Sequence, residues 1–373
     1  MITTINNKHN KLNVPNLRFP EFQGEWEKCK LGDLCNVLMC KRILASQTNT
    51  EEGVPFYKIG TIGNAPDAYI SKELFDDYKT KYNYPHKGEV MITCAGTVGK
   101  CVIYDGKDAY YQDSNIVWID NPSQCISNSF LYHLLAKVDW RKLNSTTIIR
   151  IYNDDLRNLK LNYPQIEEQQ KISRLLSLLD ERIATQNKVI DKLQSLIKGI
   201  AQKIVRNNKP NVRLAECLEC KSSTLQESEV CEQGTYPVYG ANGIVGYLDN
   251  YNTEGEAVYI IKDGSGVGTV SYVTGKCSAT GTLNTLQAKD GYSLQYLYYL
   301  LKVFNFEPYK TGMAIPHIYF KDYGKAKVFC PSYTEQLQYA RLLSAIEGKL
   351  SIEKNILISL SLQKQYLLRQ MFI

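Results

Sequence analysis

Two long stretches of the chain have a helical pattern of hydrophobic residues. The segments from Glu168 to Arg206 and from Glu335 to Ile373 contain no proline, and their apolar residues recur at alternating steps of four and three. This spacing is typical of a helix that packs along one seam against another helix. The first seam runs through Ile172, Leu176, Leu179, Ile183, Gln186, Ile190, Leu193, Ile197, Ile200 and Ile204. The second seam runs through Tyr339, Leu343, Ile346, Leu350, Glu353, Leu357, Leu360, Lys364, Leu367 and Met371.

The length of these segments predicts what they pack against. A single amphipathic helix usually lies on the core of its own domain. The 39 residues from Glu168 to Arg206, however, would make a rod of roughly 58 Å, which is longer than a domain of this size is wide. The first helix carries the chain away from one part of the protein, and the second starts beyond the next part. We therefore expect the two helices to run antiparallel against each other.

The segments in front of these helices have a different pattern. Short runs rich in Gly, Tyr, Val and Ile are broken by turn residues such as Asn64-Ala65-Pro66 and Asp263-Gly264. Runs of this kind predict short β-strands joined by turns, with a few short helices between them. We therefore expect an α+β fold for each front part.

The second half of the chain repeats the first at an offset of 167 residues. Without a gap, the aligned pairs are Ile148 with Ile315, Ile151 with Ile318, Tyr152 with Tyr319, Asp155 with Asp322, Pro164 with Pro331, and Glu168-Gln169 with Glu335-Gln336. Upstream the match is weaker, although Gly99–Lys107 resembles Gly268–Lys276 and Leu131-Tyr132 resembles Leu297-Tyr298. The polar seam positions Gln186 and Glu353 coincide as well. Matches along one diagonal predict two copies of one structural unit.

The repeat and the seams together predict the plan of the chain. We expect a first domain over residues 1–166, a long helix over 167–209, a second domain over 210–333 and a second long helix over 334–373. Two such copies joined by antiparallel helices would be related by an approximate twofold axis. The two domains would then be presented in inverted orientation.

Composition and charge narrow the class of protein. The 373 residues are 44% hydrophobic and 22% charged, which is typical of a globular protein. The net charge of +6 is compatible with a polyanionic partner but is too small to indicate one by itself. Eleven cysteines without a framework of spacings indicate reduced thiols. Residues 1–19 lack the apolar core of a signal peptide, and no apolar run is long enough to span a bilayer. We therefore expect a cytoplasmic protein with no membrane partner.

The sequence offers no complete set of catalytic, metal-binding or cofactor-binding residues. Asp120-Asn121-Pro122-Ser123 lacks the second proline and the aromatic residue of a methyltransferase tetrad, and we interpret it as a turn after a strand over Asn115–Ile119. The glycine runs Gly96–Lys100 and Gly264–Gly268 complete neither GxGxxG nor a P-loop, so a hairpin is favoured. Cys217-x-x-Cys220 is half of a zinc site without a second pair. We expect no metal, no cofactor and no catalysis.

Several motifs resemble the specificity subunits of type I restriction-modification enzymes. The opening Pro15–Pro20 (PNLRFP), followed by Gly24-Glu25-Trp26 and Lys30–Leu34 (KLGDL), is similar to the start of many such subunits. Tyr236–Gly243 (YPVYGANG) resembles the start of one of their target-recognition domains. The strongest mark is Pro164 followed by Glu168-Gln169 at the entry to a long helix, which is repeated at Pro331 with Glu335-Gln336. The resemblance covers nearly the whole chain, and its specificity lies in the order and double occurrence of the motifs.

This resemblance implies a non-catalytic subunit that recognises DNA. Each front part would be a target-recognition domain that reads one half of a split, asymmetric site in double-stranded DNA, and the helices would set the spacer. The helices would also bind two methyltransferase subunits, and the complex would include restriction subunits that translocate and cut DNA. The helices of the two copies match better than the front parts. Two equal partners need equal docking surfaces, whereas two different half-sites need different readers.

Candidate DNA-binding residues are polar and aromatic side chains in the loops of the front parts, because these types match the groups on base edges and phosphates. The candidates for base reading are Lys41, Arg42, Tyr57, Lys58, Tyr239, Asn242 and Lys262. The candidates for contact with the DNA backbone are Thr97, Lys100 and Ser265 on the glycine runs. Arg150 and His317 are candidate cations at equivalent positions. For each residue the competing interpretation is a solvated loop side chain or a buried tyrosine.

One alternative from another class remains open. The long helices could form a homodimer, in which case the chain would be a stand-alone DNA-binding or scaffolding protein. An enzyme with both activities would need the motifs that are missing. With net charges of +2 over 1–166 and −2 over 210–333, the front parts would contact few phosphates, so we expect tight DNA binding only in a complex.

Overall fold

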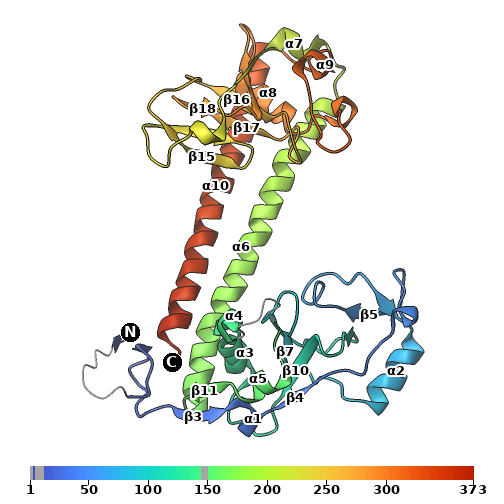
Figure 1. Ribbon diagram of the computed structural model, residues 1–373, viewed down its shortest axis with the longest axis vertical. Coiled ribbons are helices and arrows are strands. Elements are labelled where there is room, and N and C mark those ends of the chain that lie inside the picture. Colours follow the sequence, from blue (N-terminus) through green and yellow to red (C-terminus); the bar gives the residue numbers. More distant parts are fainter. Residues whose placement is uncertain (1–2, 5–11, 144–149) are drawn as a thin grey trace. The chain divides into compact units, whose positions relative to one another are not determined.

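The computed structural model describes residues 3–4, 12–143 and 150–373 (Figure 1). The chain divides into two compact units, of which unit 1 contains Met1–Ala184 with Ile358–Ile373, and unit 2 contains Thr185–Leu357. The long helices α6 (Ile166–Arg206) and α10 (Tyr333–Gln370) contribute to both units. Ile148, one of the residues aligned in the repeat, lies outside the described residues.

Unit 1 is built around an antiparallel four-stranded sheet in the order β4-β10-β7-β8. These strands are β4 (Asn36–Leu38), β7 (Val90–Thr93), β8 (Cys101–Ile103) and β10 (Ile116–Asp120). In a second sheet, β5 (Val54–Tyr57) pairs antiparallel with β6 (Tyr69–Ile70) and parallel with β9 (Tyr110–Tyr111). Two further antiparallel pairs are β3 (Glu27–Lys30) with β11 (Lys160–Tyr163), and β1 (Thr3–Thr4) with β2 (Leu17–Arg18). The short helices are α1 (Leu31–Leu34), η1 (Ala45–Gln47), α2 (Lys72–Lys81), α3 (Asn128–Lys137), α4 (Trp140–Leu143) and α5 (Asn153–Arg157).

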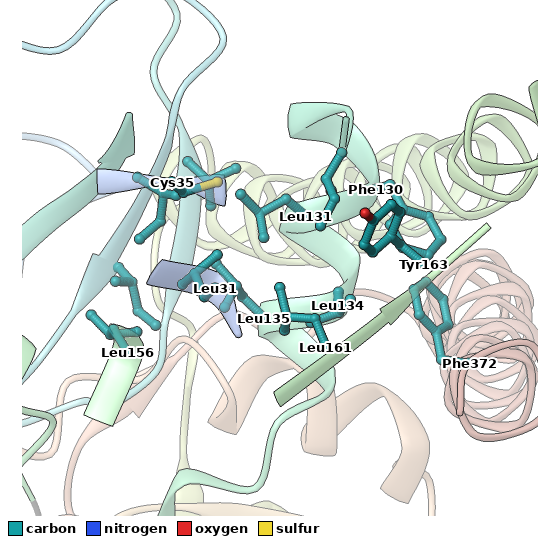
Figure 2. Close-up of a cluster of buried hydrophobic side chains, with 14 of the residues drawn as sticks. Leu31, Cys35, Phe130, Leu131, Leu134, Leu135, Leu156, Leu161, Tyr163 and Phe372 are labelled. Carbon is teal, nitrogen blue, oxygen red and sulfur yellow. The ribbon is translucent and has the colours of Figure 1, made fainter. Parts of the chain in front are cut away.

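The main sheet of unit 1 separates two hydrophobic cores. Because side chains alternate between the faces of a strand, a strand that is covered on both sides is apolar at every position. Strand β10 shows this, since Val117 and Ile119 join the core on the helix side and Ile116 and Trp118 join the core on the other side. Figure 2 shows the helix-side core, where Leu131 and Leu135 of α3 lie close to Leu31 and Cys35. The sheet is therefore fixed from both faces.

Unit 2 has the same plan. Its four-stranded sheet has the order β13-β19-β16-β17, and its three-stranded sheet has β14 between antiparallel β15 and parallel β18. The strands are β12 (Val212–Arg213), β13 (Leu218–Ser222), β14 (Tyr236–Gly240), β15 (Gly243–Leu248), β16 (Ala257–Ile261), β17 (Val270–Val273), β18 (Ser278–Ala279), β19 (Leu283–Ala288) and β20 (Lys327–Val328). The short helices are α7 (Leu214–Cys217), η2 (Glu227–Glu229), α8 (Leu294–Leu301), η3 (Glu307–Tyr309) and α9 (Phe320–Tyr323).

Backbone hydrogen bonds confirm that the two units are copies of one fold. Leu31 N donates to Leu159 O, and Leu214 N donates to Ala326 O at the equivalent place. Ile151 N donates to Cys94 O, and Ile318 N donates to Lys262 O. The four-stranded sheet, the three-stranded sheet and the pair β3–β11 of unit 1 each have a counterpart in unit 2, whereas β1–β2 has none among the described residues, although the sequences of the front parts match only weakly. The α+β fold and the internal repeat are therefore confirmed.

The seams of the two long helices are buried within each unit. In unit 1, Ile172, Leu176 and Leu179 of α6 share a core with Leu360 and Leu367 of α10 and with Met371 just beyond it, and Ile183 packs against this core. In unit 2, Ile190 and Ile197 of α6 share a core with Leu343 and Leu350 of α10, with Leu193, Ile346 and Leu357 packed against it. The polar seam positions Gln186 and Glu353 contact each other, since Gln186 Nε2 donates a hydrogen bond of 2.5 Å to Glu353 Oε2. Lys364, another polar seam position, pairs with Asp180.

The helix segments run antiparallel in each unit. In unit 2, the side chain of Asn211, just beyond α6, forms hydrogen bonds with the backbone of Cys330, just before α10, while Gln186 meets Glu353. In unit 1, Asp180 meets Lys364, and Phe372 beyond α10 stacks on Phe130 of α3, which follows the turn held by Gln169 near the start of α6. The predicted antiparallel packing is confirmed within each unit.

The Glu-Gln motif joins each long helix to its own domain. Gln169 Nε2 donates to Pro164 O and its Oε1 accepts from Ser127 N, while Gln336 makes the same bonds to Pro331 O and Ser293 N. These bonds fix the start of α3 and of α8 against the first turn of the long helix. The long helices begin at Ile166 and Tyr333, one residue before the expected bounds of 167 and 334, and in α10 Glu335 reaches back to the Ser332 backbone as part of a capping pair.

The two glycine runs form equivalent hairpin loops. Residues 94–100 connect β7 to β8, and residues 262–269 connect β16 to β17. Gly99 and Gly268 have φ angles of +82° and +90°, and a Cβ at either position would collide with an aromatic ring, Trp140 or Phe306. The hairpin interpretation is confirmed, and the glycines serve a backbone conformation and a close approach to an aromatic side chain.

All eleven cysteines are free thiols. Burial raises the pKa of Cys94 and of Cys101 to about 12, so both thiols stay protonated at neutral pH. No helix in the described part of the chain combines the length and the apolar character that crossing a membrane requires.

A first prediction tests the seam with neighbouring residues of α10. Leu343 is 1% exposed and Leu342 is 50% exposed. Leu343→Ala should lower the free energy of unfolding by about 2–5 kcal/mol, because it leaves a cavity between α6 and α10. Leu342→Ala, the matched control, should change it by less than about 0.5 kcal/mol. Urea unfolding followed by circular dichroism measures both, and equal effects of the two variants would contradict the seam.

A second prediction tests the hairpin loop of unit 1. Gly99→Ala should be destabilising by more than about 1 kcal/mol, because it adds backbone strain and a collision with the Trp140 ring. Gly88→Ala is the control, since Gly88 also has a positive φ of +93° but has open space around its Cβ position. Thermal unfolding compares the two variants, and the tryptophan emission of Gly99→Ala should also change. A Gly99→Ala protein as stable as the Gly88→Ala protein would show that the loop does not pack in this way.

Candidate nucleic-acid interface

All seven unit 1 candidates lie on one group of loops. We define the unit 1 loop cluster as residues 41–42, 57–64, 94–100, 112–115 and 150–152. Lys100 Nζ donates to Ile62 O at 2.5 Å, which ties the hairpin loop to the loop after β5. Gln112 N donates to Tyr57 O at 2.9 Å, so the loop after β9 joins the same group. The predicted residues Arg42, Tyr57, Lys58, Thr97, Lys100 and Arg150 all lie on this cluster, as does Lys41.

The cations of the unit 1 loop cluster fall into two groups. Arg42 forms an ion pair of 2.8 Å with Asp113, and Lys58 forms one of 2.9 Å with Asp67. Lys41 lies over the ring of Tyr82 at 5.4 Å, and Lys100 is held by a backbone carbonyl. Within the described residues, Lys41 and Lys100 form no ion pair. These two are therefore the lysines of the cluster whose charge no carboxylate offsets.

The loop after β9 holds Arg42 and Arg150 close together. Asp113 pairs with Arg42, and the next residue, Ser114, accepts a hydrogen bond of 3.1 Å from Arg150 Nη2 through its carbonyl. Ser114 has a φ of +53°, which is unusual for a residue other than glycine. Such strain is often found where a loop is held in a functional conformation. Arg150 also lies over the ring of Tyr152 at 5.9 Å.

Tyr57 and Tyr239 occupy equivalent positions that sequence alignment did not pair. Tyr57 O accepts from Gln112 N, and Tyr239 O accepts from Thr280 N, in the matching parallel strand pairs. Tyr57 stacks on Tyr111 with ring centroids 5.7 Å apart, and Tyr239 lies 5.6 Å from Tyr259. Burial raises the pKa of Tyr239, so its hydroxyl stays protonated. Both rings are partly buried, so only part of each is available to a ligand.

Unit 2 has a cleft of 620 Å³ that contains two of its candidates, Lys262 and His317. His317 Nδ1 lies 2.6 Å from Asp263 Oδ1, and both side chains are about one-third exposed. Ser222 Oγ donates to Asn284 Oδ1 at 2.7 Å on the wall of the cleft. Tyr319, which is 49% exposed, lies at its edge with Lys321 Nζ 5.3 Å from its ring. The cleft thus offers hydrogen-bond donors, acceptors and an accessible ring.

The remaining unit 2 candidates lie apart from this cleft. Asn242 is exposed in the turn between β14 and β15, and Ser265 is exposed in the loop between β16 and β17. Neither of them nor Tyr239 lines the cleft. The structure therefore brings Lys262 and His317 together and leaves Tyr239, Asn242 and Ser265 on neighbouring segments.

Equivalent positions in the two units have different chemistry. Arg150, which donates to a carbonyl oxygen, stands where unit 2 has His317 beside Asp263. Cys94, a buried thiol, stands where unit 2 has Lys262. The backbone frame is the same at both places. Two domains that recognise different base sequences need different side chains at equivalent positions of the same backbone.

Sequence reasoning missed the acidic partners of its own candidates. Asp113 and Asp263 orient Arg42 and His317, and neither carboxylate stood out as a site residue. The exposed pair Tyr152 and Tyr319 also escaped notice, although both tyrosines align in the repeat and are 61% and 49% exposed. The signal that could have identified them is that, in both copies, the tyrosine follows two residues after a candidate cation, Arg150 or His317.

The paired cysteines of the sequence do not form a site. Cys217 Sγ lies 3.8 Å from Cys330 Sγ in the core of unit 2, and Cys220 belongs to strand β13. Among the described residues, no group of three or more potential ligands could hold a metal ion. Strand β10 runs from Ile116 to Asp120 rather than from Asn115 to Ile119, so Asp120 ends the strand and Asn121–Ser123 follow it.

Comparisons with known proteins agree on one family. The family model of the type I restriction modification DNA specificity domain matches residues 23–195 and 208–362, once in each repeat. A Haemophilus influenzae protein assigned as a type I restriction enzyme specificity subunit is 47% identical over 169 residues, which are 45% of this chain and 43% of that protein. The chain thus spans less than half the length of that relative. A Mycoplasma genitalium protein assigned as a type I specificity subunit is 26% identical over 92% of this chain and 96% of its own length.

Solved structures show the same fold. The crystal structure of the type I restriction-modification S subunit from Mycoplasma genitalium has a TM-score of 0.67 at 20% identity, and covers 96% of this chain and 99% of its own. A chain from a structural study of type I complex assembly and conformational transition has a TM-score of 0.52 at 16% identity. Because the family match takes in both repeats and most of the chain, this chain belongs to the type I restriction-modification DNA specificity family.

Proposed function

We propose that this chain is the non-catalytic, sequence-specific DNA-binding subunit of a type I restriction-modification complex. It binds a bipartite, asymmetric site in double-stranded DNA and directs two methyltransferase subunits and the restriction subunits to that site. Residues 1–166 and 210–333 are the target-recognition domains, and residues 167–209 and 334–373 are the spacer helices. The chain itself needs no cofactor in this role.

The observation that carries the proposal is that the two units have the same backbone fold and the same connection to their long helices, but different side chains on their loops. The connection that Gln169 or Gln336 makes at the base of each domain consists of the same hydrogen bonds in both units. The loop positions at Cys94 and Lys262, and at Arg150 and His317, differ in chemistry. Two copies of one partner need matching surfaces, whereas the two halves of an asymmetric site need different ones. This division of labour is the one that a bipartite specificity subunit requires.

The candidate residues have specific roles in this proposal. In unit 1, Lys41 and Lys100 contact phosphates, since no carboxylate in the described chain neutralises them, and Arg42 and Arg150 flank the loop of Asp113 and Ser114. In unit 2, Lys262, Asp263 and His317 offer donors and an acceptor to base edges from the cleft. With front parts of net charge near zero, affinity for DNA depends on the rest of the complex.

A stand-alone scaffold that homodimerises through its coiled coil is not favoured. The seam residues that such a dimer would need are buried inside the chain, between α6 and α10 of each unit. A homodimer through this seam would have to separate the two helices first.

A third prediction concerns the modularity of the domains. Replacing residues 213–330 by the corresponding domain of a relative should change one half of the methylated motif and leave the other half and the spacer intact. The replaced segment ends before the connection of Gln336 to Pro331, so the entry to α10 is preserved. Single-molecule sequencing of host DNA, with the methyltransferase subunit co-expressed, measures the motif. A swap that alters both halves would overturn the two-reader proposal.

A fourth prediction concerns the spacer. Duplicating Ile183–Val189 in α6 and Leu350–Ile356 in α10 inserts one heptad in each helix, centred on the Gln186–Glu353 pair, so the seam keeps its register. The added rise of about 10 Å corresponds to about three base-pair steps. The methylated motif should keep both halves and gain about three base pairs between them. A control that duplicates only the α6 heptad should lose methylation, because the seams of the two helices no longer match. An unchanged spacer in the double insertion would show that the helices do not set the spacer length.

A further inference from the structure

A basic cleft lies at the edge of unit 1, on elements that contribute no candidate DNA-reading residue. We define it by five cations, Lys28 and Lys30 on β3, Lys160 on β11, Lys137 at the end of α3 and Arg369 near the end of α10. Its volume is 1120 Å³. Figure 1 shows β3 and β11 on the opposite side of unit 1 from β5 and α2, so the cleft is separate from the loop cluster.

The charge of the basic cleft is not balanced within the described chain. Asp33 is the one acidic residue that lines it, and its carboxylate accepts a hydrogen bond from Lys30 N. Among the described residues, none of the five cations forms an ion pair. Lys137 donates instead to the backbone oxygen of Ile373, and burial lowers its pKa. A partly buried cation without a carboxylate side chain beside it is costly, and an anion in the cleft would relieve that cost.

The strand pairing itself concentrates the charge. In the β3–β11 ladder, Lys30 lies directly opposite Lys160, and Lys28 lies opposite Asn162. Their side chains share the outer face, because Leu161 and Tyr163 of β11 point into the core in Figure 2. Like charges directly opposite each other destabilise a strand pair. A lysine pair here therefore needs a reason other than stability of the free chain.

Unit 2 repeats this like-charged pair. Its equivalent strands β12 and β20 place Arg213 directly opposite Lys327. Lys327 follows Lys160 at the repeat offset, and Arg213 precedes Leu214 as Lys30 precedes Leu31. The same unfavourable pair in both units, in front parts that otherwise diverge, indicates a partner that meets both units in the same way.

We propose that the basic cleft, and its counterpart around Arg213 and Lys327, bind an acidic protein segment with apolar side chains between its carboxylates. Leu12 and Ile373, which are 48% and 45% exposed, line the cleft beside the cations, and a DNA backbone would leave these apolar walls without a partner. The chain's own residues 1–11 cannot supply the segment, since they contain Lys8, His9 and Lys11 and no acidic residue. If the proposed function holds, the partner is the methyltransferase subunit, which docks once on each unit.

The test uses a charge reversal that favours the fold. Lys160→Glu and Lys327→Glu each turn a like-charged cross-strand pair into an opposite-charged one, so the double variant should unfold at the same or a higher temperature. The matched control is Lys107→Glu with Lys276→Glu, which changes the charge equally at repeat-equivalent lysines outside the cleft. Full-length chains are titrated with the methyltransferase subunit proposed as the partner, and with a DNA duplex of arbitrary sequence.

The expected result is specific to the protein partner. The Lys160→Glu/Lys327→Glu chain should bind the methyltransferase at least about tenfold more weakly, because a favourable charge contact becomes a repulsive one, and the control should stay within about twofold. Native mass spectrometry of Lys160→Glu alone should show one methyltransferase retained where the unaltered chain retains two. Binding of the DNA duplex should not change.

Two outcomes would overturn the inference alone. One is methyltransferase affinity of the cleft variant equal to that of the control, and the other is loss of duplex affinity in the cleft variant, which would make the cleft a nucleic-acid site. Failure of the unaltered chain to bind the methyltransferase would instead remove the proposed function, and the inferred partner with it.

Discussion

Burial of one apolar seam along α6 and α10 is the interaction on which the rest of each unit depends. A fully buried leucine or isoleucine contributes about 1.5–3 kcal/mol, and each unit buries several of them from both helices. The same cores include the apolar residues of the domain helices α3 and α8, so the seam and the domain share one hydrophobic core in each unit. Gln169 and Gln336 then fix the direction in which each domain leaves its helix. The loops that carry the candidate contacts are positioned by that connection.

The parts of the structure that follow from periodicity could be predicted from the sequence. The seam depends on spacing alone, and every predicted seam residue is buried or partly buried. The repeat could be seen in the sequence around Ile151 and Ile318, which donate equivalent backbone hydrogen bonds to the loops after β7 and β16. The residues are alike there because the segment packs on its domain in the same way in both copies. The equivalence of Tyr57 and Tyr239 could not be seen in the sequence. The strands β9 and β18, with which their strands pair, differ in sequence, and unit 1 has the additional helix α2 between β6 and β7.

The candidate site was predictable in its location but not in its chemistry. Residue type indicated Arg42 and His317, and the structure adds that each is held by a carboxylate, Asp113 or Asp263. Such a pair depends on where two loops meet, which spacing along the chain does not fix. The partly buried rings of Tyr57 and Tyr239 show the opposite case, in which a residue of a suitable type is largely used for packing. The lysine ladder of β3 and β11 was also invisible, because only the strand register places Lys30 opposite Lys160.

The central claim is that two copies of one frame read two halves of a divided DNA site. The most direct measurement is a base-resolution map of methylated DNA from a host that expresses the methyltransferase subunit, with and without this chain. The account predicts methylation only when the chain is present, at a single motif whose two different halves are separated by a constant number of unspecified base pairs. Methylation at one contiguous motif, or the same methylation without the chain, would contradict it.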